Sequence, residues 1–225
     1  NYSTAIGMGA LSTQSQSGDV DVYNTAVGYN AGAAVTTGTN NTLIGGLAGD
    51  AITTASYNTA TGSSSLTSTT TGTANVAMGS DALYTNTTGD SNVAVGNNAL
   101  RLSTTASNNT AVGKDALTAN TTGIQNTAVG SLTLDANTTG NENTAVGYAA
   151  LSTATTAGGN TAMGWGAMIS TTTGYANVAI GVSALGVQTT GNQNVAVGSL
   201  TLDALTTGTF NVAVGQAAGG AVTTG

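Results

Sequence analysis

Acidic side chains are the residues of this chain most capable of chemistry. The 225 residues include nine Asp and Glu, two Lys and Arg, and neither His nor Cys. Zinc sites built on imidazole or thiolate, and catalytic triads that use His, are therefore excluded. The acids are scattered along the chain, as Asp81, Asp115, Asp135, Glu142 and Asp203 illustrate. We interpret them as solvated surface acids and expect no enzyme activity, no metal site and no cofactor.

A second set of residues could bind a ligand without reacting. Three aromatic residues at one position of the repeat, Tyr29, Tyr148 and Trp165, could stack against a carbohydrate, although tolerated variation at an exposed edge explains them better. Threonine pairs recur in "NTTG" segments, where they form either a flat array or a purely structural ladder. The candidate surface residues are Thr87, Thr88, Thr121, Thr122, Tyr148 and Trp165. The same segments contain glycosylation sequons at Asn86 and Asn120, which arise from the repeat and need not indicate glycosylation.

A seventeen-residue repeat positions all of these residues. Phrases such as "NTAVGYAAL" recur at this fixed interval without a slip. Such self-similarity is typical of a repeat architecture, in which each copy is one structural unit. The twelve strict copies begin at Asn24, Asn41, Asn58, Asn75, Asn92, Asn109, Asn126, Asn143, Asn160, Asn177, Asn194 and Asn211.

The period and the composition favour short strands over helices. Helix-pair repeats need about 34 residues, and leucine-rich repeats need about 20 to 29. The many glycines disfavour helix, whereas Val, Ile and Thr favour strands. The sequence therefore predicts an all-β parallel β-solenoid with one repeat per coil and about 4.8 Å between coils. Its handedness stays open.

Fixed positions within the repeat predict how a coil is built, counting the asparagine as position one. Position five is Gly in every strict copy, and Thr-Thr at positions thirteen and fourteen precedes Gly or Ala at position fifteen. We expect the asparagines to form a hydrogen-bonded ladder and both glycines to make turns, the second with positive φ. The ladder and turn residues include Asn24, Gly28, Asn92, Gly96, Asn126, Gly130, Asn194 and Gly198.

The predicted strand has two unlike faces. Alternation places positions two and four on one face, and Asn, Ala and Gly on the other. Position nine is usually Leu or Met, so each coil offers few sizeable apolar side chains. We therefore expect other copies of the chain to cover the flat small-residue face, in a closed three-fold homotrimer.

The repeat also sets the domain organisation. Residues 24–225 form one continuous repeat domain, and residues 1–23 form a looser first coil with extra residues between Ser12 and Tyr23. A repeat protein needs capping repeats at its ends, and neither end of the sequence reads as one. We therefore expect the chain to be part of a longer fibre.

The charge distribution narrows the choice of partners. The net charge is −7, and Arg101 and Lys114 are the only basic residues. Nucleic acid is therefore not expected as a partner. No apolar run approaches the roughly 20 residues that span a bilayer, so we expect no membrane insertion. A hydrophobic share of 40%, placed at fixed intervals, argues against disorder.

The repeats resemble those of two groups of surface fibres. "NTAVGYAAL", "NVAVGNNAL" and "NTAVGKDAL" resemble the head repeats of trimeric autotransporter adhesins, whose repeat is shorter. The longer phrase "NTAVGKDALTANTTG" resembles repeats of phage tail fibres. The resemblance covers nearly the whole chain. It implies left-handed parallel β-rolls, three chains to a fibre, and an adhesive or structural role at a bacterial or virion surface.

We therefore expect a non-enzymatic fibre segment, outside the cell or on a virion, that presents a binding tip. A host receptor or glycan would be bound by regions outside this segment or by outward loops. Two alternatives stay open. The first is a self-assembling extracellular filament, and the second is an ice-binding solenoid that uses the Thr ladders.

Overall fold

The computed structural model describes residues 2–15 and 21–224. The described chain forms two compact units, Asn1–Asn109 and Thr110–Gly225, called here the first and the second unit. Part of the predicted insertion between Ser12 and Tyr23 falls on residues 16–20, which lie outside the described residues.

Both units consist of three-residue strands joined by turns. Each strand after the second begins seventeen residues after the previous one. The strands of the first unit are β1 (Thr4–Ile6), β2 (Thr25–Val27), β3 (Thr42–Ile44), β4 (Thr59–Thr61), β5 (Val76–Met78) and β6 (Val93–Val95). Those of the second unit are β7 (Thr110–Val112), β8 (Thr127–Val129), β9 (Thr144–Val146), β10 (Thr161–Met163), β11 (Val178–Ile180), β12 (Val195–Val197) and β13 (Val212–Val214).

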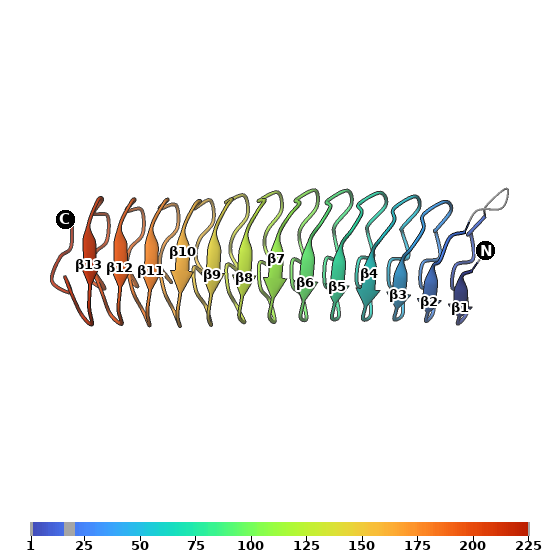
Figure 1. The fold of residues 1–225 in the computed structure, drawn as a ribbon, viewed down its shortest axis with the longest axis horizontal. Coiled ribbons are helices and arrows are strands. Elements are labelled where there is room, and N and C mark those ends of the chain that lie inside the picture. The colour runs from blue at the N-terminus through green and yellow to red at the C-terminus, as the bar shows by residue number, and fades with distance from the viewer. Residues whose placement is uncertain (1, 16–20, 225) are drawn as a thin grey trace. The chain divides into compact units, whose positions relative to one another are not determined.

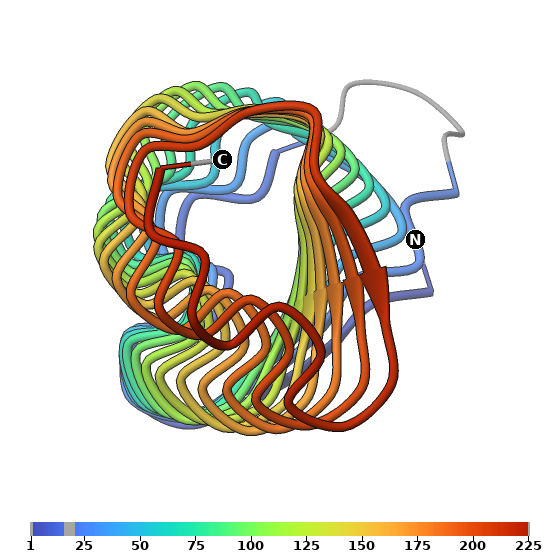
Figure 2. The same ribbon diagram turned by 90° about the vertical axis from the view of Figure 1, so that its left-hand side faces the viewer.

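Within each unit, consecutive strands lie side by side and run parallel (Figure 1). The register matches the repeat: Thr127 pairs with Thr144, and Val129 pairs with Val146. Each seventeen-residue copy therefore makes one coil, with its strand along one side and turns around the remainder (Figure 2). The prediction of an all-β parallel β-solenoid is confirmed.

Hydrogen bonds between coils continue well beyond the short strands. The backbone N–H of Thr144 donates to the carbonyl of Asn160 at 2.8 Å, and in the turns Leu134 N–H donates to Ala150 at 3.0 Å. Further round the coil, Thr138 N–H donates to the carbonyl of Thr155 at 2.9 Å. Backbone groups in the turns are thus paired as they would be in a sheet. Strands of only three residues can therefore hold neighbouring coils together.

The interior of each coil is lined by the small-residue face of the strand. Ala145 is fully buried, as are Asn143 and Leu151 of the same coil. The expectation that this face would be open to other chains is therefore wrong. Alanine therefore points inward together with Leu151, while Thr144 and Val146 of the same strand point outward and are exposed and half-buried, respectively.

The glycine at position fifteen has a different role from the one predicted. A positive φ was expected there, but Gly140 does not adopt one. A Cβ atom on Gly140 would instead collide with the carbonyl oxygen of Ala157 in the next coil. Close approach of neighbouring backbones therefore explains the preference for Gly at this position.

Candidate functional site

The predicted asparagines form a buried column inside the coils. Asn143 Nδ2 donates to Asn126 Oδ1 at 3.0 Å and to the carbonyl of Ala157 at 2.8 Å. Its own Oδ1 accepts the backbone N–H of Asn160 at 3.1 Å and the Asn160 Nδ2 at 3.2 Å. Each side chain therefore binds the coils on both sides and a carbonyl of its own coil.

The other predicted ladder residues repeat these contacts. Asn24 Oδ1 accepts hydrogen bonds from the backbone N–H and from the Nδ2 of Asn41. Asn92 donates through Nδ2 to Asn75, and Asn194 donates in the same way to Asn177. All of these asparagines are fully buried, so their amides replace water for backbone groups that would otherwise be unpaired.

The glycine at position five allows the chain to turn after each strand. The φ angles are 139° at Gly28, 138° at Gly96, 135° at Gly130 and 134° at Gly198. Residues with a Cβ atom rarely adopt this conformation. A Cβ on Gly130 would also lie 2.5 Å from the carbonyl oxygen of Gly147 in the next coil. Both backbone conformation and space therefore require Gly here.

The two threonines of each pair occupy different environments. Thr87 and Thr121 are half-buried, and their hydroxyls donate to carbonyls of the next coil, at 3.1 Å for Thr87 and Thr104. Thr88 and Thr122 follow directly and are exposed. The first threonine of each pair thus joins coils, whereas the second faces solvent.

The sequon asparagines that precede these pairs lie inside the coil. Asn86 and Asn120 are fully buried, and their Nδ2 atoms donate to the carbonyls of Gly89 and Gly123. An oligosaccharide transferase could not reach these amides in the folded chain.

The two candidate aromatics lie together on the second unit. The rings of Tyr148 and Trp165 are stacked, with centroids 6.4 Å apart and an angle of 11° between their planes. About half of each side chain is exposed. They share position six of consecutive coils, and each follows the glycine that comes directly after strand β9 or β10.

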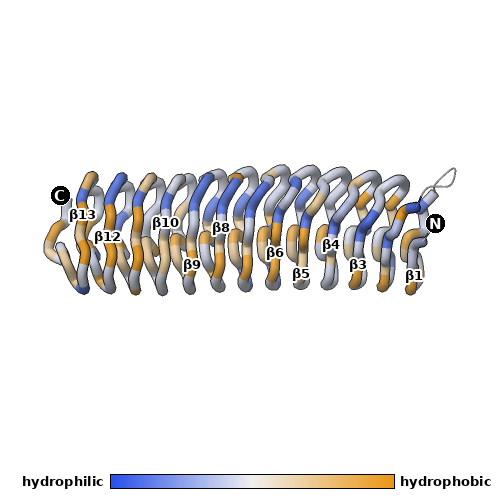
Figure 3. Tube along the Cα trace, viewed as in Figure 1, coloured by the Kyte–Doolittle hydropathy of each residue, from blue (hydrophilic) through white to orange (hydrophobic). Residues whose placement is uncertain are grey.

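The outer face of the strands is an uncharged surface that recurs in every coil. We define the outer strand face as the first and third residues of each strand, which are Val, Thr, Ile or Met throughout. Met78, Met163 and Ile180 on this face are 45%, 42% and 39% exposed. Hydrophobic residues recur at the level of the strands within each unit (Figure 3).

The charged side chains do not gather into a site. In the part of the chain that the structure describes, no three Asp or Glu side chains are close enough to hold a metal ion. Lys114 pairs with the adjacent Asp115 at 3.4 Å, and Arg101 lies over the Tyr84 ring. Burial raises the pKa of the Asp50 and Asp135 carboxyl groups, and each has one buried oxygen without a hydrogen-bond partner.

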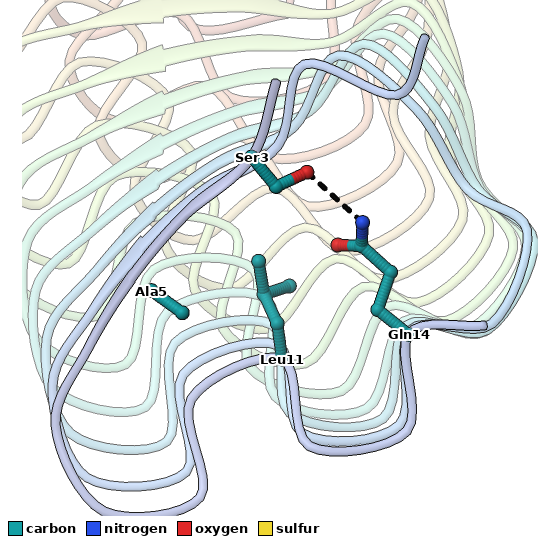
Figure 4. A pocket seen from close by; sticks show the side chains of 4 residues that line it. All are labelled: Ser3, Ala5, Leu11 and Gln14. Atoms are coloured by element: carbon teal, nitrogen blue, oxygen red, sulfur yellow. Dashed lines mark hydrogen bonds between the residues drawn. The ribbon is translucent and has the colours of Figure 1, made fainter. Parts of the chain in front are cut away.

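One hollow of about 190 Å³ lies at the first coil, between Ser3, Ala5, Leu11 and Gln14 (Figure 4). Gln14 Nε2 donates to Ser3 Oγ at 2.9 Å across it. Ala5 corresponds to Ala26 and the other buried alanines of later coils. The hollow is thus the interior of the first coil, which in later coils of the unit lies between two neighbouring coils.

Comparison with known proteins gives no match. No protein-family model, no curated protein and no solved structure is similar to this chain at a significant level. Among the described residues there is also no helix of the length and hydrophobicity needed to cross a membrane.

Sequence reasoning missed the outer strand face as a candidate surface. Alternation shows that positions two and four share a face, but it does not say which face is buried. A signal was nevertheless present, because position four varies among Val, Ile, Met and Thr whereas position three is Ala with one exception. A surface tolerates such variation in size better than a packed interior does.

Proposed function

We propose that this chain is a structural segment of an extracellular fibre at a bacterial or virion surface, which holds a binding tip away from that surface. The observation that carries the proposal is the buried asparagine column, which joins each coil to both of its neighbours within a unit. No part of a coil can leave without breaking side-chain and backbone hydrogen bonds to the coils on either side.

This arrangement gives a physical basis for rigidity. In stacked repeats, stability is approximately the sum of the stabilities of single repeats and of the interfaces between neighbours. Here each interface contains strand, turn and side-chain hydrogen bonds, including the bond from Thr138 Oγ1 to the carbonyl of Thr155 at 3.0 Å. Few segments can open alone, so resistance to bending and to proteases is expected.

We propose further that three copies associate through the outer strand face. This face carries no charged residue in any strand, whereas the acids and bases lie at other positions of the coil. Its exposed Val, Ile and Met side chains would be removed from water by the association. The homotrimer expected from the sequence is thus retained, but its seam moves from the small-residue face to the opposite face of the strand.

Light scattering on the purified chain tests the trimer. One chain has a mass of 21.5 kDa, and a closed trimer would have about 65 kDa. We expect Val146→Lys, on the outer strand face, to shift the mass towards one chain without changing the circular dichroism spectrum. Ser131→Lys is the matched control, because Lys114 already occupies the same position of the preceding coil.

The other outcomes are equally informative. A parent chain that stays at the mass of one chain overturns the trimer. A mass that grows with concentration beyond three chains supports the self-assembling filament instead.

A further inference from the structure

The second threonine of each pair is an exposed residue that never varies. Position fourteen is Thr in all twelve strict copies and is exposed in every one. In the second unit these residues form what we call the threonine row: Thr122, Thr139, Thr156, Thr173, Thr190, Thr207 and Thr224.

Neighbouring exposed positions vary freely. Position six of the second unit holds Lys, Ser, Tyr, Trp, Val and Gln in different coils, and position sixteen holds Ile, Asn, Gly, Tyr and Thr. Copies of one repeat serve as an internal comparison, since all share the same backbone. A surface residue that stays constant among such copies is under a constraint that its neighbours do not share.

Contacts within the chain do not account for that constraint. The hydroxyl at position thirteen donates to a carbonyl of the next coil, as Thr155 does to Thr172 at 3.3 Å, and this explains the first threonine. Within the described residues, the hydroxyls of the threonine row have no such partner. Hydrogen bonding inside the solenoid therefore explains one threonine of each pair and leaves the other to an external partner.

The choice of Thr shows which groups that partner would use. Val would supply the same β-branched shape without the hydroxyl, and Ser would supply the hydroxyl without the methyl group. Both occur on the surface of these coils, Val at position two and Ser at position six, but neither occurs in the threonine row. The surface thus selects for a hydroxyl and a methyl group together.

The row is also regular, rigid and uncharged. Coils in register repeat about every 4.8 Å, which is close to the repeat of oxygen rows in hexagonal ice. The β-branched side chain has few rotamers, so little conformational freedom is lost on binding. Along the chain, each threonine of the row stands between the threonine of position thirteen and the Gly or Ala of position fifteen, so no charged residue is adjacent to it in sequence.

We propose that the threonine row binds the surface of ice. The hydroxyl groups would take the places of lattice waters, and the methyl groups would lie in the spaces between them. This function goes beyond the structural role proposed above and does not depend on the trimer.

Ice adsorption of the whole 225-residue chain tests the proposal. The fluorescently labelled chain is expected to accumulate on a growing ice crystal, to shape it and to slow its growth. Thr156→Tyr, in the middle of the row, should lose most of this activity while the unfolding temperature stays unchanged. Ser131→Tyr is the matched control and should retain it, because Tyr148 occupies that position in the next coil.

Two smaller changes keep the test decisive if Thr156→Tyr disturbs folding. Thr156→Val and Thr156→Ser each remove one of the two groups, and both should weaken ice adsorption. The proposal is overturned if the parent chain fails to adsorb to ice. It is equally overturned if the control and the row variants lose activity to the same extent.

Discussion

The coils of residues 24–57 in the first unit fill their interior differently from those of residues 126–193 in the second unit. In the coils of residues 126–193, position nine is Leu or Met and position three is Ala. In the first unit, position nine is glycine at Gly32 and Gly49, and position three of the second of these coils is Leu43. A Cβ on Gly32 would lie 2.6 Å from the Leu43 side chain, and one on Gly49 would lie 2.8 Å from it. Leu43 therefore fills the space that leucine at position nine fills elsewhere.

The residue at position twelve also changes where glycine replaces leucine at position nine. It is Val35 and Ile52 in the two coils of the first unit that have glycine at position nine, and both are fully buried. In the second unit the same column includes polar residues, where Asn137 Nδ2 donates to Asn120 Oδ1 at 2.9 Å. Positions three, nine and twelve thus share one interior volume.

The largest expected effect on stability concerns the turn at position five, which occurs in the coils of both units. Gly130→Val places a branched side chain at a φ of 135° and against the Gly147 carbonyl, so it should destabilise the fold by more than about 4 kcal/mol. Chemical denaturation measures this loss. Gly46→Val in the first unit is the control, since a Cβ on Gly46 meets nothing within 4 Å. A Gly130→Val variant as stable as its parent would show that the turn assignment is wrong.

Removing one asparagine from the column should act alike in both units. Asn143→Ala removes the partner of the buried Asn160 backbone N–H and of the Ala157 carbonyl. Asn41→Ala does the same to the Asn58 N–H and the Ala55 carbonyl. Each should cost about 3–4 kcal/mol, because two buried backbone groups are left unpaired. Denaturant titration compares the two. Asn97→Ala, at an exposed site, should change stability little, and an equal loss there would contradict a special role for the column.

Leu43 should contribute to stability because position nine is glycine both in its own coil, at Gly49, and in the preceding coil, at Gly32. Leu43→Ala should cost about 2–3 kcal/mol by leaving a cavity. Gly49→Leu alone overpacks the same space and should cost about 1–3 kcal/mol. The double variant should be less destabilised than the two losses together, as a double-mutant cycle in denaturant would measure. Strict additivity would show that the two residues do not share a volume.

The smallest expected effect concerns a partly buried acid. Burial raises the pKa of Asp135 above its ordinary value of 3.8, so the folded chain binds this proton more tightly than the unfolded chain. Its contribution to stability is therefore present at acid pH and is lost as the pH rises through the raised pKa. Asp135→Asn should stabilise the chain at neutral pH by up to about 0.5 kcal/mol. It should also flatten the dependence of the unfolding temperature on acid pH, and a steeper dependence would be inconsistent with this assignment.

Much of the fold follows from the spacing of a few residue types. The seventeen-residue period, the parallel register and the asparagine column can all be predicted, because identical residues in successive coils must lie beside one another once the coils stack. The exposure of Thr88 and the burial of its neighbour Thr87 could not be predicted in this way. Both are threonine, and only the path of the turn separates them.

The sequence by itself determined the repeat, its strands and the residues that form ladders. Only the tertiary structure decided which face of the strand is inside. Alternation is symmetric with respect to the two faces, and the choice depends on what lies across the coil. Leucine at position nine and the side chain at position twelve occupy most of the interior, so alanine and asparagine face inward, as Ala145 and Asn143 do. Valine and threonine of the same strand are thereby left on the surface, where a partner can reach them.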